Sequence, residues 1–310
     1  MGRATVADIK GKGVSKLDKE TKANTEDTNK VSNTNKNKIT TSSDSRGKKS
    51  RRRLRKTMTL PASAVVHPVQ RLFNACKDVF ASAGTGFVPS PDKIEQLSAL
   101  LDEIQPADVG LTPQMRFFSP QSTRRVPTIT YLHIHECEKF SIGIFCLPPS
   151  GVLPLHNHPG MTVFSKLLLG TVHIKSYDWV VDVPTTSAAV DPSQTAQQSD
   201  VCLAKVKVNS DMTAPCKTSI LYPADGGNMH CFTAVTACAV LDVLGPPYSD
   251  RDGRHCTYYS DYPFTRFSAD EQVSMAEEEK DKLAWLQERD KPENLVVVGA
   301  PYTGPEIVEN

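Results

Sequence analysis

The first apolar pattern in the chain begins near Val66 and has the spacing of helices. Over residues 69–80 the large apolar side chains recur at steps of three and four, which places them on one helix face. Residues 94–104 repeat this spacing after Ser90-Pro91-Asp92, a sequence typical of a helix start, and Pro106 ends the pattern. We therefore expect two helices that pack outside a sheet.

Beyond Met115 the pattern changes to short runs rich in β-branched and aromatic residues, separated by proline and glycine. Short strands without helices between them predict an all-β dominated domain, built as a sandwich or barrel. We expect a surface loop over 182–200, and a charged helix over 270–289 with Trp285 and Leu286 facing inward. The predicted strands are 128–134, 140–145, 161–164, 171–174, 202–208, 219–222 and 236–243.

Charge separates the N-terminal part of the chain from the rest. Residues 1–60 contain 17 basic and 6 acidic residues and no aromatic residue, whereas the remaining 250 contain 19 basic and 29 acidic residues. Such a segment cannot bury enough apolar surface to offset its ordering entropy. We therefore predict a disordered basic extension over 1–60 and one folded domain over 66–310.

A dense basic cluster lies within this extension, over residues 46–56. It suits an acidic groove of a nuclear import receptor, or phosphate contacts on nucleic acid, and the alternative is a solvated tail without a partner. No stretch approaches the roughly 20 apolar residues that cross a bilayer, so we expect no membrane association. We expect a monomer in the nucleus and the cytoplasm.

Two His-x-His pairs stand out among the eight histidines, because alternate residues of a strand point to the same face. His133 and His135 lie in a predicted strand with the composition of a half-exposed edge, and no second ligand cluster is near them in sequence. We interpret that pair as structural. His156 and His158 are the candidates for metal binding.

The sequence around His156 and His158 resembles the first motif of the cupin superfamily, with one glycine ahead of the pair and another twelve residues after it. That motif normally has a glutamate ligand where this chain has Val163. Downstream, Pro223-x-x-Gly226-x-x-x-His230 matches the kernel of the second cupin motif. The resemblance implies a double-stranded β-helix, a jelly-roll-like barrel, whose metal ligands are three neutral imidazoles.

Three histidines on one face of an octahedral ion leave three open positions and do not reduce its charge. Such a centre favours a substrate that brings its own anion, and a thiolate that binds next to O₂ is the natural candidate. A structural zinc site would need a fourth ligand. Cys231 is a poor one, because neighbours on a strand face opposite ways and it adjoins His230.

From about Val66 to its C-terminus the chain resembles the plant cysteine oxidases, a branch of the thiol dioxygenases that includes aminoethanethiol dioxygenase. The resemblance implies an Fe(2+) enzyme that adds both atoms of O₂ to the sulfur of an N-terminal cysteine. Its usual plant substrates are group VII ethylene response factors, whose oxidised N-termini are arginylated and degraded through an N-degron pathway, so that oxygen supply sets their lifetime. The segments that carry the resemblance are 131–137, 140–146, 155–161, 241–248, 253–258 and 299–305.

The resemblance implies that His156, His158 and His230 bind the iron. Asp242 is a charged residue in an otherwise apolar strand, and we expect it either to hydrogen-bond a ligand or substrate group or to serve as a buried structural anchor. Tyr248 is expected on a loop at the cavity mouth, where it donates to bound oxygen or substrate, or else packs as an aromatic residue.

Cys256 and Tyr258 resemble the pairs that form a thioether in some thiol dioxygenases. Two further interpretations of the chain stay open at this point. The first is another metal cupin, either a small-molecule thiol dioxygenase or a zinc isomerase. The second is a non-catalytic nuclear binding protein in which the cupin is a scaffold for the basic extension.

Overall fold

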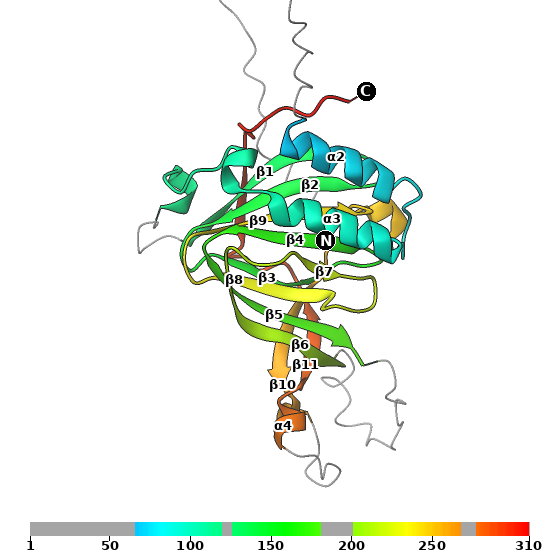
Figure 1. Cartoon of the computed structure of the whole chain (residues 1–310). Coiled ribbons are helices and arrows are strands. Elements are labelled where there is room, and N and C mark those ends of the chain that lie inside the picture. Colours follow the sequence, from blue (N-terminus) through cyan, green and yellow to red (C-terminus); the bar gives the residue numbers. More distant parts are fainter. Residues whose placement is uncertain (1–65, 120–125, 181–200, 268–276, 310) are drawn as a thin grey trace, which may run out of the picture. The chain divides into compact units, whose positions relative to one another are not determined.

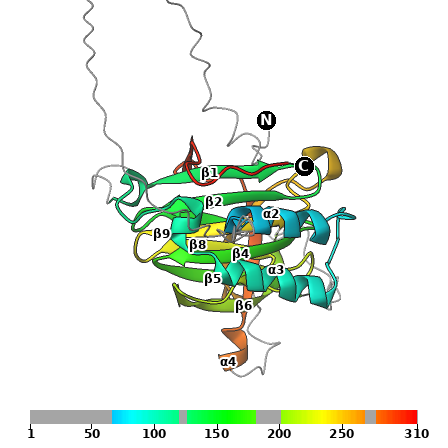
Figure 2. The same cartoon turned by 45° about the horizontal axis from the view of Figure 1, so that its top comes forward.

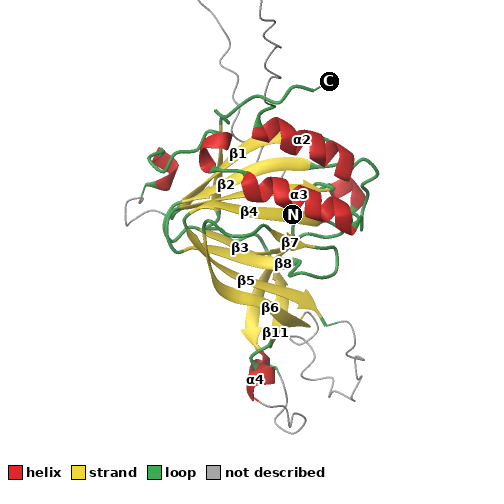
Figure 3. Cartoon of the chain, viewed as in Figure 1, coloured by secondary structure: helices red, strands yellow, loops and turns green. Residues whose placement is uncertain are grey.

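A computed structural model of the chain describes residues 66–119, 126–180, 201–267 and 277–309. The predicted extension over 1–60, its basic cluster and the predicted loop over 182–200 lie outside the described residues. The described part consists mostly of strands, with few helices (Figures 1 and 3). None of its helices combines the length and the apolar character that a bilayer span requires.

The strands form two groups, and this arrangement confirms the all-β dominated class and the double-stranded β-helix expected from the cupin resemblance. The first is a six-stranded sheet in the order β12 (Val296–Ala300), β1 (Thr128–Glu136), β2 (Ser141–Leu147), β9 (Cys238–Gly245), β4 (Thr162–Leu169) and β7 (Ser219–Leu221). The second is a closed barrel in the order β10 (Tyr258–Pro263), β11 (Leu283–Arg289), β6 (Val201–Thr213), β5 (Thr171–Trp179), β8 (Met229–Ala234) and β3 (Val152–Asn157).

Two helices cover one face of the six-stranded sheet (Figures 1 and 2). They are α2 (Pro68–Val79) and α3 (Pro91–Glu103), which confirm the two predicted helices. Nδ1 of His67 accepts a hydrogen bond from the backbone N–H of Val69 and so caps the first turn of α2. The buried faces of both helices share one hydrophobic cluster with β2, β4 and β9. Short 3-10 turns follow, η1 (Pro106–Val109) and η2 (Arg116–Phe118).

Strand alternation decides which side chains face away from these helices. On β2, Ile142 and Ile144 join the helix-facing cluster, so Gly143 between them points to the other side of the sheet. On β9 the cluster takes Leu241 and Val243, and the alternation turns Asp242 away from the helices. The period of two therefore places this carboxylate on the inner face of the sheet.

The predicted helix over 270–289 is wrong from residue 281 onward. Residues 268–276 are not described, α4 (Glu277–Lys280) is one helical turn, and β11 pairs with β10 and β6. Consequently Trp285 and Leu286 do not both face inward. Leu286 is buried in the barrel, and Trp285 is half-buried on the other face, where it stacks on Phe264 at 6.2 Å between ring centroids. Pairing with two strands outweighs the weak helical pattern of this charged segment.

Strands β3, β8, β10 and β12 were not predicted, although β3 and β8 carry the candidate metal ligands. The expected half-exposed edge at His133 and His135 is correct in part. β1 lies between β12 and β2, but β12 pairs only with Thr128–Leu132, so the two histidines lie beyond its end. Two further 3-10 turns, η3 (Asp250–Asp252) and η4 (Phe264–Arg266), flank β10.

Candidate metal centre

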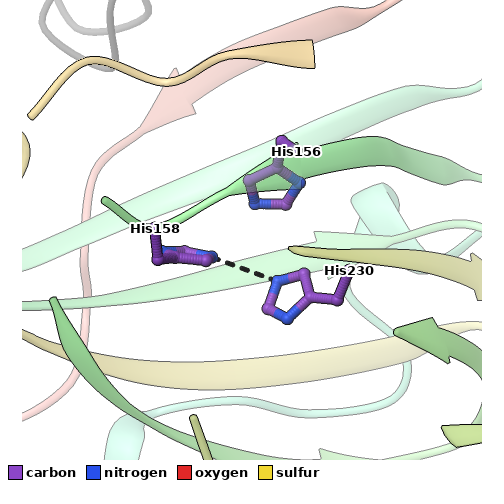
Figure 4. A group of neighbouring side chains, drawn as sticks. All are labelled: His156, His158 and His230. Carbon is purple, nitrogen blue, oxygen red and sulfur yellow. Dashed lines mark hydrogen bonds between the residues drawn. The ribbon is translucent and has the colours of Figure 1, made fainter. Parts of the chain in front are cut away.

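Three imidazole rings meet on the side of β3 and β8 that faces the six-stranded sheet. The ring centroids of His156, His158 and His230 form a nearly equilateral triangle with sides of 4.9, 4.8 and 4.8 Å. One ligand nitrogen from each lies within 4.8 Å of the others, and Nε2 of His158 is 3.2 Å from Nε2 of His230 (Figure 4). The structure thus brings together the three residues proposed as ligands.

The pairing of β3 with β8 makes this triangle. His156 lies opposite His230 in the antiparallel register, and His158 follows two residues later, just past the end of β3. A register shift between Leu153 and His156 marks an irregularity in the strand immediately before the ligands. At the other end of the motif, Gly227 has φ +84°, and a Cβ there would lie 2.5 Å from Oγ of Ser176.

A backbone carbonyl fixes the orientation of the first ligand. Nδ1 of His156 lies 2.8 Å from the carbonyl oxygen of Pro154, which can only accept a hydrogen bond. His156 therefore carries its proton on Nδ1, and Nε2 keeps its lone pair for a metal ion.

Tyr248 fixes the orientation of His158, because its hydroxyl has a single proton and two neighbours. Its hydroxyl lies 2.7 Å from the carbonyl oxygen of Asn157 and 3.0 Å from Nδ1 of His158. The single hydroxyl proton goes to the carbonyl, so the hydroxyl oxygen accepts from Nδ1–H of His158. This leaves Nε2 of His158 unprotonated and directed toward His230. Tyr248 lies on the loop after β9, as predicted, but its proton is engaged with Asn157.

Asn228 holds the backbone of His158, and the sequence analysis did not identify it. Its Oδ1 accepts from the N–H of His158 at 3.2 Å, and its Nδ2 donates to the carbonyls of His158 and Tyr222, both at 2.8 Å. Asp178 accepts in turn from the N–H groups of Gly227 and Asn228, both at 2.9 Å. The position of Asn228 two residues before His230 was the only sequence signal that it lies near the site. The sequence does not show that its side chain reaches the backbone of His158 at the end of β3.

Burial keeps the ligand imidazoles neutral. His158 and His230 are 4% and 7% exposed, and the pKa of each is held well below 6.5, first by desolvation and then by the neighbouring imidazoles. Burial also lowers the pKa of His156. A neutral imidazole with an unprotonated ring nitrogen is the form that binds a metal ion. Val163, where the motif normally has glutamate, is buried among Met161 and Leu221 and supplies no ligand.

The rings line a cavity of about 90 Å³ between the six-stranded sheet and the barrel. Asp242 lies in its wall and is 7% exposed, and its Oδ1 has no hydrogen-bond partner among the described residues. Burial raises the pKa of Asp242 to about 7, although a hydrogen bond from Ser165 opposes the shift. No hydrogen bond of the described residues joins Asp242 to a ligand histidine, so its role in binding substrate stays a prediction.

Cys256 and Tyr258 line the same cavity. The Cys256 thiol lies within hydrogen-bonding reach of the hydroxyls of Tyr258 and Tyr248, and burial raises its pKa to about 11. The proposed thioether between Cys256 and Tyr258 therefore stays a prediction with its two residues close together. Cys231 packs with a different cluster, inside the barrel around Tyr177 and Met229, as expected for a residue that faces away from His230.

The other histidine pair has structural surroundings. His135 packs edge-on against Phe73 at 4.8 Å between ring centroids, and its Nδ1 is 3.3 Å from a carboxylate oxygen of Glu309. Neither His133 nor His135 lines the cavity. The structure therefore separates the two His-x-His pairs as predicted.

Comparison with solved structures gives low scores and low sequence identity. A RmlC-like cupin protein from Desulfovibrio desulfuricans gives a TM-score of 0.26 at 19% identity, over 44% of this chain and 94% of its own. A Klebsiella pneumoniae protein with a double-stranded β-helix domain gives a TM-score of 0.27 at 10% identity, over 48% of this chain and 97% of its own.

Sequence relatives are closer. Plant cysteine oxidase 2 of Arabidopsis thaliana is 62% identical over 263 residues, which span 84% of this chain and 88% of the relative. Plant cysteine oxidase 1 of the same plant is 59% identical over 82% and 84%. The human 2-aminoethanethiol dioxygenase is 30% identical over 70% and 82%. The family model PCO_ADO matches residues 100–307, and the chain therefore belongs to this family of thiol dioxygenases.

Proposed function

We propose that this thiol dioxygenase binds Fe(2+) and oxidises the N-terminal cysteine of target proteins to cysteine sulfinic acid. The observation that carries the proposal is a trio of neutral imidazoles, two of them buried, that face the same cavity as Asp242, whose Oδ1 has no hydrogen-bond partner among the described residues. In the reaction RS⁻ + O₂ → RSO₂⁻ both oxygen atoms go to sulfur, so no other reductant is needed.

The donor set fits a ferrous ion. Imidazole suits iron, and three such ligands on one face leave positions open for other groups. None of the three is an anion, so the charge of the ion is available to attract a thiolate. When bound, the iron supplies a Lewis-acid centre and the one-electron chemistry that O₂ requires.

The protein's own residues would bind and orient the substrate. An N-terminal cysteine carries its thiol and its amine on adjacent carbons. If the thiol binds near the three histidines, the amine of the same residue lies in the same cavity, whose wall contains Asp242. A cationic amine there favours the charged form of a carboxyl whose pKa burial has raised to about 7. Apolar side chains of Phe145, Phe232 and Leu244 line the cavity and limit the entry of water.

The experiment is a peptide assay on iron-loaded protein. The full chain is reconstituted anaerobically with Fe(2+), then given O₂ and a peptide that begins with cysteine. We expect a mass gain of two oxygen atoms on that cysteine, and no gain in a matched peptide with an acetylated N-terminus. Oxidation of 2-aminoethanethiol or free cysteine without oxidation of the peptide would instead support a small-molecule thiol dioxygenase.

We further propose that the substrates are transcription factors of the group VII ethylene response type, degraded through an N-degron pathway when oxygen is present. The support is the relationship to the two plant cysteine oxidases.

We also propose that the basic cluster over 46–56 directs part of the protein to the nucleus, with the remainder in the cytoplasm. Deletion of 46–56 should change this distribution and leave peptide oxidation unchanged. Unchanged distribution would leave the cluster as a solvated tail.

A further inference from the structure

The metal cavity is too small for a polypeptide substrate. Its volume is about 90 Å³, whereas sites for drug-sized ligands measure roughly 300–1,000 Å³. The cavity thus has room for the thiol and amine of one residue. If the substrate is a protein, its following residues must lie outside this cavity, in a neighbouring one.

Two further cavities share walls with the metal cavity. One, which we name the loop groove, measures about 620 Å³ and shares Glu136, Pro247 and Tyr248 with it. The other, the proline cavity, measures about 260 Å³ and shares Pro154 and Leu295. Within the described part of the chain, these two cavities offer a bound protein ways to continue from the metal cavity.

The loop groove is formed by three segments of the chain, and Tyr248 is one of its lining residues. They are residues 83–85 after α2, the turn at 136–139 between β1 and β2, and the segment 246–254 between β9 and β10. The groove contains acidic and basic side chains: Glu138 and Arg251 are exposed, and Lys139 donates to the carbonyl of Ala83 at 2.9 Å.

A buried arginine fixes two of these segments to each other. Arg254 is 5% exposed, and its guanidinium donates to the carbonyl of Pro247 at 3.0 Å, to a carboxylate oxygen of Asp252 at 2.9 Å, and to the hydroxyl of Thr85. The segment 246–254 is thereby held to the segment after α2. This is a pre-formed site, as most ligand sites are.

The chemistry of the two cavities differs. The proline cavity is lined mainly by proline, valine and leucine, with Arg289 as its one charged residue. Each residue of a polypeptide brings a polar N–H and C=O that need partners when they leave water. The loop groove offers such partners and also has more than twice the volume.

We propose that the loop groove binds the polypeptide that follows the N-terminal cysteine of the substrate, and that Glu138 and Arg251 select among substrates by charge. The inference rests on the proposed function, because it assumes a protein substrate. Rim charges discriminate between partners more than they add affinity.

The test uses charge reversal in the full iron-loaded chain. Two peptides begin with the same three residues, Cys first, and differ only in Lys or Asp at positions 4 to 6. For Glu138→Lys, Arg251→Glu and wild type, kcat/KM of each peptide is measured relative to that of 2-aminoethanethiol on the same preparation. The matched control is Arg289→Glu, which reverses a charge at the proline cavity instead. Metal content and circular dichroism of every variant are checked.

We expect Arg251→Glu to shift the Lys/Asp preference toward the Lys peptide by about twofold to fivefold, and Glu138→Lys to shift it toward the Asp peptide by a similar factor. Both shifts should shrink as salt is raised. A shift in Arg289→Glu alone would overturn the proposal in favour of the proline cavity, and so would unchanged preferences in all three variants. If wild type oxidises 2-aminoethanethiol but neither peptide, the proposed function itself is wrong. This result is distinguishable from failure of the groove proposal, in which wild type oxidises both peptides.

Discussion

Replacement of Asn228 by alanine should weaken the fold and the metal site together. Asn228 is 8% exposed, and its amide makes three hydrogen bonds to backbone groups, two of them to His158. Alanine removes these three hydrogen bonds, and of the three groups the carbonyl of His158 keeps a donor, the N–H of Met161 at 3.2 Å. At roughly 1 kcal/mol for each hydrogen bond, the loss of unfolding free energy is about 3 kcal/mol. A domain of ordinary stability, about 5–15 kcal/mol, still folds after that loss.

The same substitution should also lower the affinity of the site for a metal ion, which is measured independently of stability. Without Asn228 the peptide group of His158 is free to shift, and groups that orient metal ligands typically contribute about 10-fold to 100-fold to affinity. Urea unfolding of the metal-free protein gives the stability, and competition with a chelator for Co(2+) gives the affinity. The matched control is Asn209→Ala on β6, where Oδ1 of an exposed asparagine lies 3.1 Å from Nε2 of His173. That variant should lie within about 0.5 kcal/mol of wild type and bind metal equally well.

One result would refute the reasoning. If Asn228→Ala lost stability but kept the Co(2+) affinity of wild type, Asn228 would be a buried polar residue of the core with no part in placing His158. A variant as stable as wild type would show that the three hydrogen bonds are not formed in solution.

Three further predictions concern the site. His230→Ala should lose metal binding, measured by elemental analysis, while its circular dichroism stays that of a folded protein; full metal content would contradict the ligand assignment. Tyr248→Phe removes the acceptor for Nδ1–H of His158 and should weaken Co(2+) binding about 10-fold, with unchanged affinity as the contrary result. Asp242 has its pKa raised by burial, so its contribution to stability is present below about pH 4 and is lost as the pH rises through about 7. In the metal-free state, urea unfolding should therefore show wild type losing about 4 kcal/mol relative to Asp242→Asn over that interval, and parallel pH profiles would exclude a buried, protonated Asp242.

Local signals were enough to predict the two helices and the three histidines that meet at the candidate metal centre. The signals that predict α3 are a proline and an acidic residue at its start and apolar residues at helical spacing. All of them involve residues that are close together in the sequence. The histidines were found because the motif spacing survives, even though Val163 replaces the usual glutamate. The charged residue Asp242 stood out in the apolar strand β9, and alternation along that strand explains why it faces the cavity.

The strands that carry the ligands were missed for a physical reason. β3 contains Pro154, His156 and Asn157, and polar residues that serve a site break the β-rich pattern by which strands are recognised. The charged segment Leu283–Arg289 was assigned to a helix because its pairing with β6 and β10 joins residues far apart in sequence. The same distance hides Asn228, whose amide crosses from the β7–β8 connection to the end of β3.

Tyr248 lines both the metal cavity and the loop groove, and its hydroxyl is the acceptor for a ligand imidazole. At this residue the wall of the loop groove is also a wall of the metal cavity. If the loop groove binds a polypeptide as proposed, its contact with Tyr248 would change the hydrogen bond at Nδ1 of His158, and substrate binding would then alter the orientation of that ring.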